Sequence, residues 1–115
     1  MVGTMGKVKR INPDILKAII RQETGLDVIL ENQFHPTRQW KSDLAIPSLM
    51  IAIELEGGVW TRGRHTRGQG YIDDCTKYNA CAVLGWTVLR YTHSGHGIGD
   101  ILKDIQEIIK YRTSE

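Results

Sequence analysis

The sequence predicts one α/β domain of 115 residues, with a mixed four-stranded sheet flanked by helices. The first observation is that residues 49–55 are almost entirely apolar, as expected for a strand in the core of a sheet. The second is that apolar residues recur at helical spacing near each end of the chain. The third is the length, which suffices for one hydrophobic core. The predicted order is α-β-β-β-α-β-α.

The first half of the chain is predicted to hold a helix and three strands. Asn12 followed by Pro13 is a typical helix start, and Gly25 is a natural C-cap. Residues 1–11, before this helix, are expected to form a flexible basic arm. The strands are predicted at 28–35, 38–46 and 49–56, with a turn at Pro47-Ser48 between the last two.

The second half begins with a long glycine-rich loop that runs to about residue 70. A helix is predicted at 71–84, because Gly85 follows it, and a strand at 86–92. Residues 98–112 are predicted to form an amphipathic helix.

Composition excludes some classes of protein. No apolar run approaches the roughly 20 residues of a membrane span, and the N-terminus lacks the apolar centre of a signal peptide, so we expect a cytoplasmic protein with no membrane partner. Cys75 and Cys81 lie on different faces of a predicted helix and are expected to be small buried residues. His93 and His96 have no third ligand nearby, which argues against zinc.

Carboxylates mark the predicted second and third strands. Asp43 shares a face with Lys41, and Glu54 shares a face with Glu56. Since neighbouring strands lie about 4.8 Å apart, Asp43 and Glu54 can converge if the register pairs them, and their oxygens suit magnesium. Glu56 could orient the attacking water, help hold a second ion or bond to a basic side chain. The alternative is that both glutamates lie at an exposed strand end and pair with Lys41 or an arginine.

A basic segment follows the carboxylates. Residues 61–70 contain three arginines and one histidine without an acid, and so suit phosphate oxygens. A mobile surface loop is the alternative. His65 could protonate a leaving group or bind phosphate, and Lys77 could face the carboxylates from the next helix.

These features together resemble a known family. Asp43, followed after ten residues by Glu54-Leu55-Glu56, resembles the PD-(D/E)xK nuclease superfamily, which has the restriction-endonuclease-like fold. The chain is also similar to small phage and bacterial nucleases related to the very short patch repair endonucleases. That similarity covers residues 31–92 and rests on E-N-Q-F-H-P-T-R-Q-W-K-S-D-L-A-I-P, I-E-L-E-G-G-V-W, G-R-H-T-R-G, D-D-C-T-K-Y-N and G-W-T-V-L-R-Y-T.

The resemblance implies a magnesium site, with manganese as a substitute. Asp43 and Glu54 match the acidic ligands, and the Leu55 carbonyl could complete the shell. Glu31 and Glu23 are candidate extra ligands. Glu56 occupies the position of the usual catalytic lysine. The candidates for a basic group from elsewhere are Lys41, Lys77 and His65.

We therefore expect a magnesium-dependent DNA endonuclease. Its small size suggests a homodimer or a structure-selective enzyme that acts on branched DNA, such as a Holliday junction, or nicks DNA in a phage or mobile-element setting. The residues expected to contact DNA are Arg38, Lys41, Arg62, Arg64, His65 and Arg67. The alternative is a catalytically decayed nucleic-acid-binding or assembly module, with Glu56 marking the loss.

Overall fold

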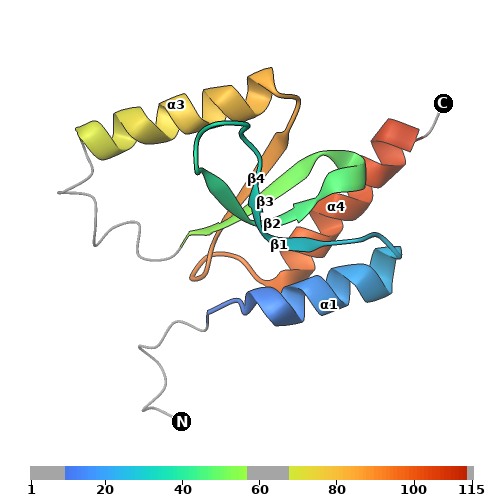
Figure 1. The fold of residues 1–115 in the computed structure, drawn as a ribbon. Coiled ribbons are helices and arrows are strands. Elements are labelled where there is room, and N and C mark those ends of the chain that lie inside the picture. The colour runs from blue at the N-terminus through green and yellow to red at the C-terminus, as the bar shows by residue number, and fades with distance from the viewer. Residues whose placement is uncertain (1–9, 57–67, 114–115) are drawn as a thin grey trace, which may run out of the picture.

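The computed structural model describes residues 10–56 and 68–113 of the chain (Figure 1). The elements are α1 (Pro13–Thr24), β1 (Ile29–Gln33), β2 (Lys41–Ile46), a short 3-10 helix η2 (Pro47–Leu49), β3 (Ile51–Glu56), α3 (Gln69–Val83), β4 (Thr87–Thr92) and α4 (Ile98–Thr113). Within these ranges the predicted order of helices and strands is confirmed. The basic arm is expected at residues 1–11. Residues 1–9 of it lie outside the described part of the chain.

The sheet is mixed, as predicted, with the strand order β1-β2-β3-β4. β2 pairs antiparallel with both β1 and β3, and β4 pairs parallel with β3. Parallel neighbours require a crossover connection, and α3 lies in that connection. Because β3 and β4 are parallel, their carboxyl ends lie side by side at the same end of the sheet.

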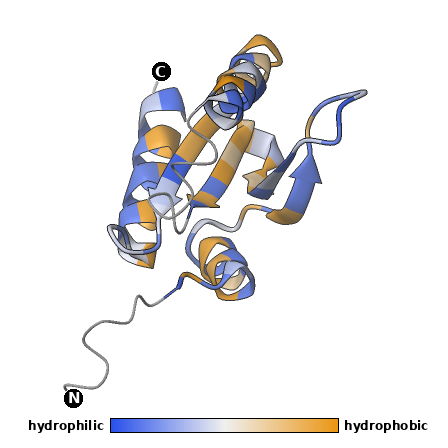
Figure 2. Ribbon diagram, turned by 90° about the vertical axis from the view of Figure 1, so that its left-hand side faces the viewer, coloured by the Kyte–Doolittle hydropathy of each residue, from blue (hydrophilic) through white to orange (hydrophobic). Residues whose placement is uncertain are grey.

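The helices cover the sheet from both sides. Helices α1 and α4 lie against one face, and α3 lies over the other (Figures 1 and 2). The main core forms on the first face, where Leu16 and Ile20 of α1 and Ile101 and Ile105 of α4 pack against apolar strand residues. Those strand residues are Leu44, Ile46, Ile51, Ile53 and Tyr91.

Both ends of α1 follow the predicted capping pattern. The Asn12 side chain accepts hydrogen bonds from the backbone N–H groups of Asp14 and Ile15, at 2.8 and 3.1 Å. Gly25 closes the helix with φ of 75°, in the left-handed region that glycine adopts without strain. The local sequence therefore determines where this helix begins and ends.

The first two strands are shorter than predicted. The first ends at Gln33 and the second begins at Lys41, so that 34–40 form a loop. In that loop the His35 ring nitrogen Nδ1 accepts hydrogen bonds from the backbone N–H groups of Thr37 and Arg38. These bonds hold the chain in a turn where a neighbouring strand would otherwise supply the partners. Periodicity could not reveal this side-chain turn.

The predicted turn at Pro47-Ser48 is present as the 3-10 helix η2, which is followed by Met50 with φ of 53°. The prediction that both cysteines are buried needs correction. Cys75 is only half-buried, whereas Cys81 is buried as predicted, and both are free thiols. No helix in the described ranges is long and apolar enough to cross a membrane.

Candidate active site

The site is built where β2 and β3 separate. The register pairs Leu44 with Ile53, and continuing it by one residue places Asp43 across from Glu54. Directly opposed residues in an antiparallel pair share a face, so both carboxylates lie at the same end and face of the sheet. Asp43 also accepts a hydrogen bond through Oδ2 from the backbone N–H of Leu55, at 2.7 Å. The Asp43 carboxylate therefore holds β3 in place next to Glu54.

Glu54 has a cationic partner on α3. The Lys77 ammonium lies 3.2 Å from Glu54 Oε2, and the two side chains are only 17% and 12% exposed. Lys77 also donates to the Lys41 carbonyl at 3.1 Å, so its Nζ bridges β2 and β3. Burial raises the pKa of Glu54; Lys77 opposes this shift, while the charges of Asp43 and Glu56 add to it. Burial and the two neighbouring carboxylates thus disfavour the charged form of Glu54, and Lys77 favours it.

Glu56 forms an ion pair with Arg90 on β4. The Arg90 guanidinium donates to both carboxylate oxygens, through Nε and Nη2. Its carbon Cζ also lies 4.4 Å from the ring centroid of Tyr78, a cation–π contact. The hydrogen bonds to Glu56 are the main reason that the pKa of Arg90 is raised. Of the roles left open for Glu56, the described residues show the bond to a basic side chain.

A cavity of about 380 Å³ opens beside Asp43. It is bounded by the start of α1, by Leu55 of β3 and by the residue that follows β4. The lining residues are Arg10, Ile11, Asn12, Pro13, Asp43, Leu55 and His93. Asp43 thus contacts the β3 backbone and also faces an open space large enough for a ligand.

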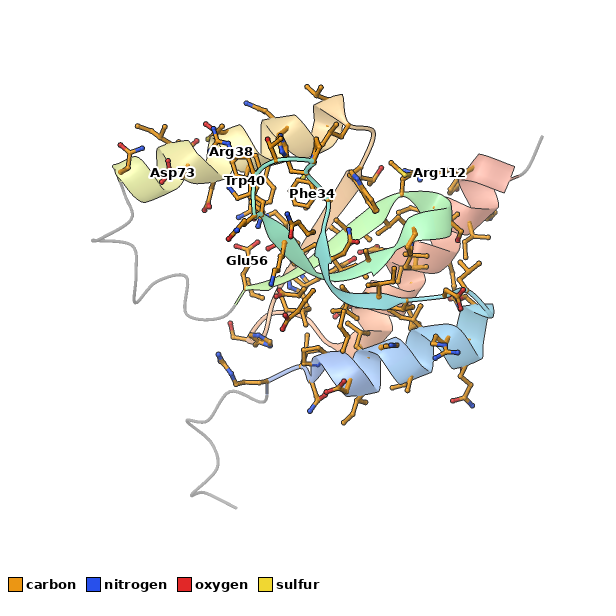
Figure 3. All side chains as sticks on the ribbon, viewed as in Figure 1. Phe34, Arg38, Trp40, Glu56, Asp73 and Arg112 are labelled. Carbon is orange, nitrogen blue, oxygen red and sulfur yellow. The ribbon has the colours of Figure 1, made fainter. Side chains whose placement is uncertain are left out.

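The other predicted site residues that the structure describes are exposed. Lys41 is exposed, and its Nζ lies 4.0 Å from Glu31, whose side chain is 77% exposed. Glu23 is exposed on α1. Arg38 lies in the β1–β2 loop with its Cζ 4.6 Å from the ring centroid of Trp40. Figure 3 shows this loop on the same side of the molecule as Glu56.

Four of the predicted DNA-contacting residues fall outside the described part of the chain. They are Arg62, Arg64, His65 and Arg67. Their contact with DNA, and any catalytic role of His65, stay predictions.

The donor set fits a hard cation. Among residues 10–56 and 68–113, no three His, Cys, Asp or Glu side chains are grouped to hold a metal ion. Magnesium, however, commonly uses one or two carboxylates and keeps several waters. Asp43 and Glu54 provide two carboxylates of that kind, next to the Leu55 backbone.

His93 and Arg90 are residues near the site that the sequence analysis did not assign to it. They could have been found from the parallel pairing, because Glu54 pairs with Arg90 and Glu56 with Thr92. His93 follows Thr92 directly and so lies at the carboxyl end of β4, next to that of β3. Periodicity alone does not identify β4 as the neighbour of β3, so the sequence did not reveal this proximity.

Comparison with known proteins adds no further assignment. No family model matches the chain, and neither a curated protein nor a solved structure matches it.

Proposed function

We propose that this chain is a magnesium-dependent DNA endonuclease of the PD-(D/E)xK superfamily. The observation that carries the proposal is the placement of Asp43 and Glu54 across from each other at one end of the sheet, with Lys77 bonded to Glu54. The order of elements and the parallel pairing of β3 with β4 also support a restriction-endonuclease-like topology. We include in this proposal a relationship to the nucleases that resemble the very short patch repair endonucleases.

Asp43 and Glu54 would hold the magnesium ion, together with the Leu55 carbonyl. Bound there, the ion would lower the pKa of a water molecule and stabilise the charge that develops on the phosphate. The chain's own part is to keep the carboxylates fixed. The hydrogen bond from the Leu55 N–H orients Asp43, and the Lys77 ammonium orients Glu54.

Lys77 is the basic group that we assign in place of the lysine missing at position 56. It already touches the acidic cluster, with Nζ 3.2 Å from Glu54 Oε2. Lys41 is exposed, and its Nζ lies near Glu31 instead. An ammonium at the Lys77 position can donate a hydrogen bond to a water or a phosphate oxygen beside Glu54, and it offsets the charge that accumulates there.

A second candidate function is a nucleic-acid-binding module that has lost catalysis. The observation that favours it is the Glu56–Arg90 ion pair, which occupies the strand position from which related nucleases extend a free lysine. In this case Asp43 would be retained because it holds the Leu55 backbone.

The experiment that separates these functions compares Asp43→Asn with the wild type. Asparagine can still accept the Leu55 N–H bond through its amide oxygen, but it carries no charge for a cation. Cleavage of supercoiled plasmid and of a synthetic four-way junction is measured with magnesium, manganese or chelator. Glu107→Gln, which removes an exposed carboxylate on α4, is the matched control.

We expect metal-dependent cleavage by the wild type and by Glu107→Gln, and a loss of at least about 100-fold in Asp43→Asn. DNA binding should persist in Asp43→Asn. Tight DNA binding by the wild type without cleavage under any metal would exclude the nuclease and favour the binding module.

A further inference from the structure

We propose that the cavity beside Asp43 is a phosphate subsite for a nucleic-acid backbone, in which His93 acts as a neutral hydrogen-bond donor and Arg10 as the cation. The inference rests on the proposed function for the identity of the ligand. It assigns a role to two residues that stand outside the carboxylate cluster.

The His93 ring is oriented by a hydrogen bond from the backbone. Its Nδ1 accepts a hydrogen bond from the backbone N–H of Ile11 at 2.8 Å, in a partly buried contact between residues 82 positions apart. A nitrogen that accepts a hydrogen bond carries no proton, so the proton of the neutral ring lies on Nε2. The contact therefore selects one tautomer and fixes the ring at the junction of β4 and α1.

This tautomer decides which edge of the His93 ring can meet a ligand. With Nδ1 occupied and Nε2 protonated, neither nitrogen is open as a metal ligand or as a proton acceptor. The ring edge that can meet a ligand in the cavity is the Nε2–H edge, which is a donor. Of the ligands that suit such an edge, an anion with exposed oxygens makes the strongest hydrogen bonds.

The cavity is lined by charged residues of both signs. Arg10, which carries a guanidinium, and Asp43 both line the cavity. Asn12 also lines the cavity, but its side-chain oxygen is engaged with the first N–H groups of α1. An anion beside Arg10 and His93 would thus sit next to the carboxylate that is proposed to hold magnesium. A phosphodiester group, which can bind magnesium and donors at once, satisfies all three contacts.

Two substitutions of His93 separate a binding role from a structural one. In His93→Asn the amide oxygen can take the place of Nδ1 and keep the Ile11 bond, while the Nε2–H donor is lost. In His93→Gln the longer side chain can place its NH₂ group near the former Nε2, but the Ile11 acceptor is lost. His96→Asn is the matched control, because His96 Nδ1 also accepts a backbone N–H, from Thr92 at 3.0 Å.

Binding is measured with a short fluorescent DNA duplex, in chelator and in the Asp43→Asn background, so that neither cleavage nor the Asp43 charge enters. We expect His93→Asn and Arg10→Met each to weaken affinity about tenfold, as the loss of a hydrogen bond to a charged group does. His93→Gln should retain more affinity than His93→Asn, and His96→Asn should bind like its parent. Thermal unfolding is recorded for each variant.

The opposite ranking, with His93→Asn binding like the parent and His93→Gln impaired, would mean that His93 only holds Ile11 in place. A direct readout is the ring ¹⁵N spectrum of His93. The Nε2 resonance should move on titration with the duplex; a resonance that responds to inorganic phosphate but not to the duplex would overturn the nucleic-acid assignment. Since these measurements involve no cleavage, they can succeed even if the chain proves not to be a nuclease.

Discussion

Single residues decide how charge is distributed at the end of the sheet. Asp43 and Glu54 bring two negative charges to one place, and Glu56 adds a third two residues along β3. Each is engaged by a specific donor: Asp43 by the Leu55 N–H, Glu54 by Lys77, and Glu56 by Arg90. These bonds make it possible for three carboxylates to lie close together, because partly buried charges without partners are costly.

Lys77 provides the sharpest prediction at this scale. Lys77→Met removes the ammonium from the side of Glu54 while retaining an apolar side chain of similar reach. We expect the catalytic rate constant on plasmid DNA to fall about 100-fold or more, with DNA affinity changed much less. Steady-state cleavage assays and binding measurements check the two quantities separately.

Lys77→Arg is the charge-preserving control, and it should recover part of the rate. A Lys77→Met enzyme that cleaves within about threefold of the wild type would refute the assignment. His65, which lies outside the described residues, would then become the first candidate to substitute.

The elements differ in how firmly they are anchored. Helices α1 and α4 bury Leu16, Ile20, Ile101 and Ile105 in the main core. Within α3, by contrast, Cys81 is the one buried residue. The apolar side chains of α3 and its C-cap that remain exposed are Tyr71, Ile72, Val83 and Leu84. The sheet face opposite the main core carries Ala45 and Ala52, whose small side chains give little apolar contact area.

This asymmetry predicts local opening of α3. In hydrogen–deuterium exchange, amides of α3 should exchange before those of β2, β3 and α1, because fewer buried apolar contacts hold that helix. Mass spectrometry of peptic fragments under native conditions measures the order. Protection of α3 equal to that of β3 would contradict the prediction and would indicate a stabilising contact, such as a second copy of the chain on its exposed face.

The weak anchoring of α3 affects the contact between Lys77 and Glu54. Lys77 belongs to α3, whereas the carboxylates belong to the sheet. A helix that opens locally would carry the ammonium away from Glu54, so conditions that stabilise α3 should also favour the Lys77–Glu54 contact.

At the scale of the whole molecule, the burial of Glu54 makes the stability of the fold depend on pH. The pKa of Glu54 in the folded state is raised above its ordinary value of 4.5, chiefly by burial. Between that value and the raised pKa, the folded chain binds more protons than the unfolded chain. The free energy of unfolding therefore falls as the pH rises through this window, and the loss persists above it.

The test compares the wild type with Glu54→Gln in chelator. The stability of the wild type relative to this variant should decrease as the pH rises from about 4.5 toward neutrality and should then level off. Urea unfolding across this pH range measures the difference, and Glu107→Gln controls for the removal of a charge at an exposed site. A relative stability that increases with pH would show that Lys77 outweighs burial at Glu54.

Much of the fold could be predicted from the sequence because the signals are local. The Asn12 cap and Gly25 bound α1, and the apolar run at 49–55 contains most of β3. The prediction failed where a side chain replaces a strand partner, as His35 does in the loop after β1. Of the candidate site, the sequence indicated the carboxylates Asp43 and Glu54, since their spacing on two successive strands allows them to meet.

Only the tertiary structure decided which cations these carboxylates meet. Arg90 reaches Glu56 across 34 positions, Lys77 reaches Glu54 across 23, and His93 receives the Ile11 N–H across 82. Caps and periodicity depend on residues within a few turns of helix or one strand. These partners depend instead on the parallel register of β3 with β4 and on the packing of α3 over the sheet, which arise only when the whole chain folds.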